Sequence, residues 1–166
     1  TDGGWGGYSY EWDVPGESAT RVVGGKTSVV NGQTWIFPSE SDCMACHTAA
    51  AGFSLGPEIA QMNRDFTYPP TSISANQLMT VEYIGLFSAP LGDMPENLPA
   101  IVDPAQMSAD LSARARAYLH SNCANCHRPT GPTPSNMDLR QDTALNATNS
   151  CDTIPLSGNL GIADAR

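Results

Sequence analysis

The sequence predicts a mainly α-helical fold with a small N-terminal β meander and much irregular loop. Two stretches carry helix signals: one opens with Ser39-Glu40-Ser41-Asp42, which resembles a capping sequence, and the other begins at Ser108. Residues 20–37 carry strand signals instead, because their β-branched runs are separated by Gly24-Gly25 and Asn31-Gly32, pairs that favour hairpin turns. The helices therefore follow a short β region.

The other expected elements complete this outline. Residues 1–18 are rich in Gly, Ser and aromatic side chains without a clear period, which predicts an irregular arm that packs over another part of the protein. Ser74 is expected to cap a further helix that ends before Pro90, and residues 91–104 are expected to form a proline-containing loop. Residues 128–166 are rich in Pro, Gly, Asn and Thr, which predicts little regular structure.

Composition and charge exclude several classes of protein. The chain has 166 residues and a net charge of −9. Residues 1–106 hold most of the acidic side chains and few basic ones, so the sequence offers no basic surface for nucleic acid or anionic lipid. No run of apolar residues is long enough to predict a membrane span. We interpret the acidity as an aid to solubility, with the steering of a basic redox partner as the alternative.

The cysteines carry the most specific signal. Four of the five fall in two copies of one motif, Cys43-Met-Ala-Cys46-His47 and Cys123-Ala-Asn-Cys126-His127. Cys-x-x-Cys-His is the attachment signature of c-type haem, because two thiols on a helical turn can bond the two vinyl groups of one haem while the next residue offers an imidazole to the iron. The sequence therefore predicts two covalently bound haem c groups. The remaining cysteine, Cys151, is expected to be buried, with a bridge to another subunit as the alternative.

Other uses of paired cysteines explain the pattern less well. Two Cys-x-x-Cys pairs can form a four-cysteine zinc site, and a single pair can be a redox dithiol. The spacer between Cys46 and Cys123 is long for a zinc ribbon, and a dithiol oxidoreductase needs one pair within a βαβ pattern. Neither use requires a histidine directly after both copies.

Each haem iron also needs a sixth ligand or has an open position. The chain contains three histidines, and two of them are the proximal candidates His47 and His127, so two bis-His haems are excluded. Met94 is the distal candidate for the first haem, because it lies in a loop after a predicted helix. His120 could ligate the first haem, ligate a haem of a neighbouring subunit, or hydrogen-bond a propionate. Met137 is the candidate within this chain for the second haem.

The order of these elements predicts the domain organisation. A helix with a motif, a helix, a methionine-containing loop and another helix follow one another as in a class I cytochrome c domain, so the predicted fold is cytochrome c-like. We expect an N-terminal arm and small β hairpin region over 1–38, a first haem c unit over 39–107 and a second over 108–166, with one compact domain as the alternative. Thioether attachment of haem takes place outside the cytoplasmic membrane, and the chain begins at Thr1 without a leader. We therefore expect a secreted protein, periplasmic or extracellular.

Several longer strings resemble a bacterial family of secreted dihaem c-type cytochromes. They are Trp35–Ser39, the first motif with Thr48–Gly52, Gln61–Asp65, Ala115–Pro129, which contains the second motif, and Asp138–Arg140. The resemblance implies a dihaem electron carrier outside the cytoplasm, with the six cysteine and histidine residues of the two motifs binding haem. Chains of this kind usually continue beyond the position of Arg166 into a Met-Pro-Pro element, which could supply a distal methionine.

Three functions remain open at this point. The first is electron transfer outside the cytoplasm between redox partner proteins, either as a shuttle or as a link in a multi-haem assembly or polymer, with self-association through haem contacts. The second is a dihaem peroxidase-like enzyme, which needs one haem with an open distal position. The third is a haem subunit of a larger oxidoreductase, which would expose apolar surface. We expect an electron carrier rather than an enzyme.

Overall fold

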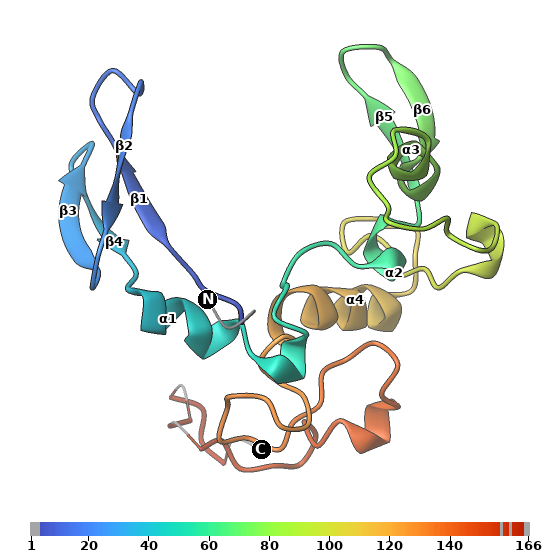
Figure 1. The fold of residues 1–166 in the computed structure, drawn as a ribbon. Coiled ribbons are helices and arrows are strands. Elements are labelled where there is room, and N and C mark those ends of the chain that lie inside the picture. The colour runs from blue at the N-terminus through green and yellow to red at the C-terminus, as the bar shows by residue number, and fades with distance from the viewer. Residues whose placement is uncertain (1–3, 157, 160, 165–166) are drawn as a thin grey trace. The chain divides into compact units, whose positions relative to one another are not determined.

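The chain folds into short helices and small antiparallel hairpins. The computed structural model describes residues 4–156, 158–159 and 161–164, and these contain four α-helices; the chain is 25% helical and 16% strand (Figure 1). The prediction of a mainly α, cytochrome c-like fold is therefore wrong. The physical reason is that strands form in more places than predicted, while three of the four α-helices have seven residues or fewer.

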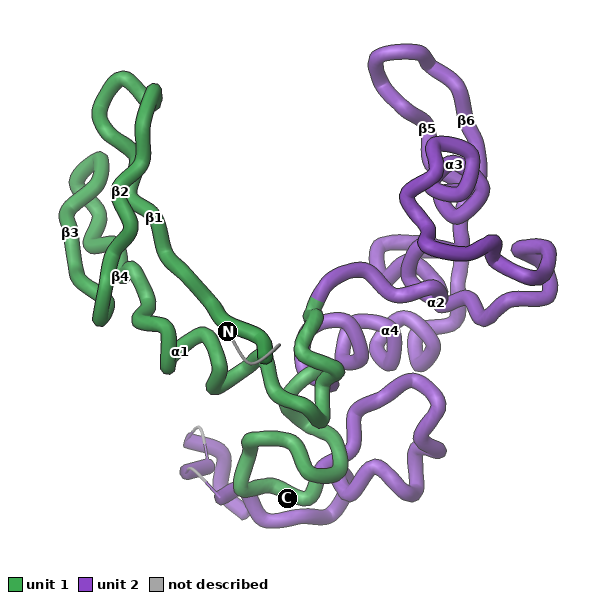
Figure 2. The backbone as a smooth tube through the Cα atoms, in the orientation of Figure 1, with its two compact units in different colours: residues 1–55, 125–136 green, residues 56–124, 137–166 purple. Residues whose placement is uncertain are grey.

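The structure divides into two compact units (Figure 2). Unit 1 comprises residues 1–55 and 125–136, and unit 2 comprises residues 56–124 and 137–166. The predicted division into 1–38, 39–107 and 108–166, with one compact domain as the alternative, stays a prediction.

Unit 1 opens with two β-hairpins. Strand β1 (Ser9–Trp12) pairs with β2 (Ala19–Val22), and β3 (Lys26–Val30) pairs with β4 (Gln33–Phe37), both antiparallel. Asn31 and Gly32 form the turn between β3 and β4 with φ of 51° and 77°, so this predicted hairpin is confirmed. Two other predictions are wrong. Gly24-Gly25 links two separate hairpins instead of joining paired strands of one meander. Strand β1 lies within residues 1–18, which were predicted to be an irregular arm.

Helix α1 (Glu40–Cys46) follows the hairpins and begins where the sequence predicts. Ser39 is the N-cap, its Oγ accepts from the Asp42 N–H at 3.2 Å, and the Asp42 carboxylate accepts from the Ser39 N–H at 2.9 Å. This reciprocal pair is a capping box. A 3₁₀ turn, η1 (Ala49–Ala51), follows directly after the helix.

Unit 2 contains the remaining elements. They are α2 (Ile59–Met62), β5 (Asp65–Tyr68) paired antiparallel with β6 (Ile73–Asn76), α3 (Gln77–Tyr83), η2 (Pro95–Asn97), α4 (Leu111–Cys123) and η3 (Leu145–Ala147). Both predicted helix starts are displaced by two or three residues. Ser74 lies in β6 and Asn76 caps α3, while Asp110 caps α4 in place of Ser108. In the part of the chain that the structure describes, no helix is both long and apolar enough to cross a membrane.

The protein has a small apolar core for its size. Leu78, Ala117 and Ala124 are fully buried, and Val22 and Leu139 are nearly so, whereas many large apolar side chains are exposed. The accessible surface is 11813 Å². A folded protein of this mass would expose about 7,900 Å², and two separate domains of these unit sizes would expose about 9,500 Å². The chain therefore exposes more surface than an ordinary globular domain, and large apolar side chains of the described residues are part of it.

Candidate functional site

The first Cys-x-x-Cys-His motif occupies the end of α1 in unit 1. Cys43 and Cys46 lie one turn apart on the helix, and the His47 N–H donates to the Cys43 carbonyl at 3.1 Å. Cys43 is half-buried and Cys46 is exposed, and both are free thiols. The helix thus presents two thiols and an imidazole within one and a half turns.

The imidazole of His47 is held by a backbone carbonyl. Its Nδ1 donates to the Phe53 carbonyl oxygen at 2.6 Å, and this fixes the tautomer with hydrogen on Nδ1. Phe53 has a φ of +63°, and its own N–H donates to the Thr48 carbonyl at 2.9 Å, so the segment after the motif curls back onto the ring. Nε2 of His47 makes no hydrogen bond within the described residues. This pattern is typical of a metal-ligating histidine, which donates one ring N–H and keeps the other nitrogen for the metal.

The N-terminal arm packs on this motif. The ring of Trp5 stacks on the ring of Phe53, with centroids 5.8 Å apart and planes 10° apart. Gly7 lies directly against Cys43, because a Cβ on Gly7 would lie 2.3 Å from the Cys43 Cβ and 2.7 Å from its Sγ. The absence of a side chain at position 7 is therefore what lets the arm reach the first thiol.

The second motif begins at the end of α4. Cys123 is the last residue of the helix and belongs to unit 2, whereas Cys126 and His127 belong to unit 1. All three are half-buried. The Nδ1 atom of His127 is buried and has no hydrogen-bond partner among the described residues. A buried ring nitrogen of this kind has lost its hydration without replacement, whereas the Nδ1 of His47 donates to a carbonyl.

A glycine also packs against the second motif. A Cβ on Gly131 would lie 2.1 Å from the Cys126 carbonyl oxygen and 2.9 Å from the Arg128 carbonyl oxygen. The Gly131 N–H donates to that Arg128 carbonyl at 2.9 Å, which closes the segment into a tight turn. Unit 1 thus contains the whole first motif together with Cys126 and His127 of the second.

The third histidine is engaged on both sides of its ring. In unit 2, Nδ1 of His120 accepts from the Gln141 N–H at 3.1 Å, so its Nε2 carries the proton and donates to the Glu58 carboxylate at 2.7 Å. The side chain of His120 is 11% exposed. These bonds tie α4 to the start of α2 and to the C-terminal segment, and both ring nitrogens are used. The role of His120 as a haem ligand stays a prediction.

A substitution separates the two roles of His120. In His120→Phe we expect the free energy of unfolding to fall by about 1–2 kcal/mol, because two hydrogen bonds are lost and the Gln141 N–H is left without its acceptor. Urea denaturation measures this loss, with Tyr118→Phe on the same helix as the control. If the protein carries the predicted haems, a change in their optical spectrum in His120→Phe would contradict a purely structural role.

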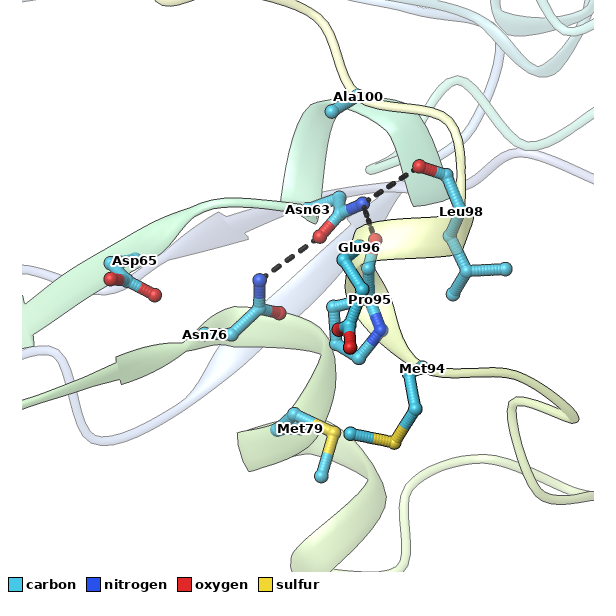
Figure 3. A pocket seen from close by; sticks show the side chains of 9 residues that line it. All are labelled: Asn63, Asp65, Asn76, Met79, Met94, Pro95, Glu96, Leu98 and Ala100. Carbon is cyan, nitrogen blue, oxygen red and sulfur yellow. Dashed lines mark hydrogen bonds between the residues drawn. The ribbon is translucent and has the colours of Figure 1, made fainter.

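Met94 lines a pocket in unit 2. The pocket has a volume of about 520 Å³, and Figure 3 shows the Met94 and Met79 side chains turned toward one another in it. It is lined by Asn63, Asp65, Asn76, Met79, Met94, Pro95, Glu96, Leu98 and Ala100. Met94 is 54% exposed. Because Met94 belongs to unit 2 and His47 to unit 1, their pairing at one haem stays a prediction, as does the use of Met137, a half-buried residue of unit 2.

One asparagine holds the Met94 loop. The side-chain amide of Asn63 donates to the carbonyls of Pro95 at 2.6 Å and Leu98 at 3.0 Å, and its oxygen accepts from Asn76 at 2.9 Å. Asn76 in turn caps α3. The loop is therefore fixed to the helix that carries Met79.

Sequence reasoning missed four residues of these sites. Met79 gives no local signal, and the role of Asn63 depends on carbonyls more than thirty positions away. The Phe53 carbonyl reaches His47 only because Phe53 has a positive φ. A positive φ is usual for glycine, as at the preceding Gly52, but is not expected for phenylalanine. The sequence shows that Gly131 lies close to the second motif but not that it packs against the backbone of that motif.

The cysteines and acidic residues form no alternative metal site in the part of the chain that is described. No group of three or more His, Cys, Asp or Glu side chains is placed there to hold a metal ion. Cys151, which was expected to be buried, is exposed and is a free thiol. The expectation is wrong because Cys151 lies in an irregular segment with no helix or strand to cover it.

Comparison with known proteins adds no relative. No protein-family model, no curated protein and no solved structure matches the chain.

Proposed function

We propose that this chain is an electron-transfer protein that acts outside the cytoplasm with two covalently attached haem c groups. The observation that carries the proposal is the state of His47: its Nδ1 is held at 2.6 Å from the Phe53 carbonyl, and its Nε2 faces no partner in the described residues. This histidine follows two free thiols on one helical turn. The proposal needs no cytochrome c fold, because the attachment motif is a local arrangement.

The residues that would hold the two groups fit this role. Cys43 and Cys46 would form the thioethers of the first group, with His47 as its proximal ligand, and Cys123, Cys126 and His127 would do the same for the second. The bound iron would supply one-electron chemistry, with a potential tuned by its axial ligands and burial. The many exposed large apolar side chains fit a protein whose interior is completed by a bulky apolar group.

The partners follow from the same chemistry. An electron carrier outside the cytoplasm would exchange electrons with other redox proteins there. The acidic sequence offers no basic surface for other classes of partner, such as nucleic acid. Contacts between haem groups of neighbouring copies would extend the same function to an assembly.

The amount of haem tests this proposal. When the full chain is produced with a periplasmic haem-attachment system, we expect two haem c per chain, measured by the pyridine haemochrome spectrum and by intact mass after denaturation. Replacing Cys43 and Cys46 with serine should reduce the content to one, because only the second motif remains. Cys151→Ser is the matched control and should leave two haems.

A redox titration completes the test. Reversible one-electron reduction of both haems, without CO binding to the reduced protein, is the expected result for an electron carrier. A chain that takes up no haem would refute the proposal. CO binding together with peroxide turnover would indicate an enzyme rather than an electron carrier.

A further inference from the structure

One arginine links the segments that follow the two motifs. Arg128 comes directly after His127, and its Nη1 donates at 3.0 Å to the carbonyl oxygen of Ala50, a residue 78 positions away in the sequence. Both residues belong to unit 1, and the bond is part-buried. A hydrogen bond from a charged guanidinium is stronger than a neutral one, so this contact can hold two segments in register.

Ala50 lies in the segment that orients His47. It is the central residue of η1, which is capped by Thr48 and ends at Gly52 in a left-handed conformation. The next residue, Phe53, supplies the carbonyl that accepts the Nδ1 proton of His47. A shift of η1 therefore moves the acceptor that fixes the His47 ring.

We propose that Arg128 is a positioning residue that couples the orientation of His47 to the second motif. The path runs from His127 through the backbone to Arg128, across the hydrogen bond to Ala50, and along η1 to the Phe53 carbonyl. The inference rests on the proposed function, since it concerns the histidine that would ligate the first haem. The hydrogen bond made by the ring nitrogen that does not bind the metal sets the orientation and basicity of a ligating histidine. Loss of the Arg128 bond should therefore change the properties of the first haem, although Arg128 is adjacent in sequence to the second motif.

The test uses the full chain with both haems attached. The haem methyl signals in the NMR spectrum of the oxidised protein report the orientation of the axial histidine, and the Cys123→Ser/Cys126→Ser variant, which keeps only the first haem, assigns them. In Arg128→Gln we expect the methyl signals and the midpoint potential of the first haem to shift. Arg64→Gln is the matched control, because it removes the same charge from an ion pair with Asp103 inside unit 2.

The outcomes separate this inference from the proposed function. First-haem signals that are the same in Arg128→Gln, Arg64→Gln and the parent protein would overturn the coupling and leave haem binding intact. Absence of haem from the parent protein, measured beforehand by the haemochrome spectrum, would instead overturn the proposed function. If Arg128→Gln does not accumulate as folded protein, the same comparison is made with Arg128→Met, which keeps an aliphatic stem but has no hydrogen-bond donor. Unchanged first-haem signals in that variant would equally overturn the coupling.

Discussion

Replacing Gly131 with alanine is expected to remove haem from the second motif and leave the first motif loaded. The new Cβ would lie 2.1 Å from the Cys126 carbonyl oxygen and 2.9 Å from that of Arg128. Both are backbone atoms on either side of His127, so no side-chain rotation can relieve the clash and the whole segment must move. We expect the free energy of unfolding to fall by about 3 kcal/mol, the upper end of the usual cost of overpacking.

The measurement is the number of haems per chain, together with the position of each. The haemochrome spectrum should fall from two haems to one, and mass spectrometry of peptides should find the remaining haem on the peptide with Cys43 and Cys46. Gly6→Ala is the matched control, because its Cβ would meet the Tyr8 hydroxyl oxygen at 3.1 Å, at the far end of a rotatable side chain. Two haems and unchanged stability in Gly131→Ala would show that the turn after the second motif tolerates a side chain.

Replacing Asp138 with asparagine is expected to lower the stability of the protein at neutral pH and to flatten its acid dependence. The carboxylate of this buried residue accepts from the Arg140 Nε at 2.9 Å and from the Arg140 Nη2 at 2.6 Å. This bidentate contact with the guanidinium holds the pKa of Asp138 well below its usual range, against the opposing effect of burial. Hydrogen bonds to a charged group contribute about 1.5–3 kcal/mol, so we expect a loss of about 2 kcal/mol in Asp138→Asn at pH 7.

The sign of the pH dependence follows from the lowered pKa. Because the carboxylate binds protons less readily in the folded protein than in the unfolded chain, its contribution is fully present above about pH 4 and is lost as the pH falls further. The free energy of unfolding should therefore drop more steeply below pH 4 in the parent protein than in Asp138→Asn. Denaturant titrations between pH 7 and pH 2.5 measure both slopes. Asp164→Asn, at an exposed carboxylate, is the control, and equal slopes in Asp138→Asn and the parent would refute the assignment.

The elements that were predicted correctly are those whose signals are local. The capping box of α1 joins Ser39 to Asp42, and the turn of the β3–β4 hairpin needs only Asn31 and Gly32. Both are decided within four residues, so the sequence alone contains their cause. The Cys-x-x-Cys-His motifs are local signals too, but the attachment of haem to them stays a prediction.

The elements that were missed depend on residues far apart or on very short patterns. Strands β5 and β6 have four residues each, too few for alternation to distinguish them from loop. The assumption of a cytochrome c-like fold failed for a related reason, since motif order says nothing about whether the intervening residues form helices. The contact of Arg128 with Ala50 forms only when segments far apart in the sequence meet, so no local pattern could predict it.

The small apolar core of the described residues has a consequence for cleavage by proteases. With so few side chains buried among the described residues, the polypeptide by itself has little to protect its backbone from cleavage, because proteases act on segments that open easily. On the proposed function, a chain that fails to acquire both groups would be degraded before it could compete with loaded copies for their partners. The abundance of the protein would then be controlled by the supply of haem outside the cytoplasm as much as by its rate of synthesis.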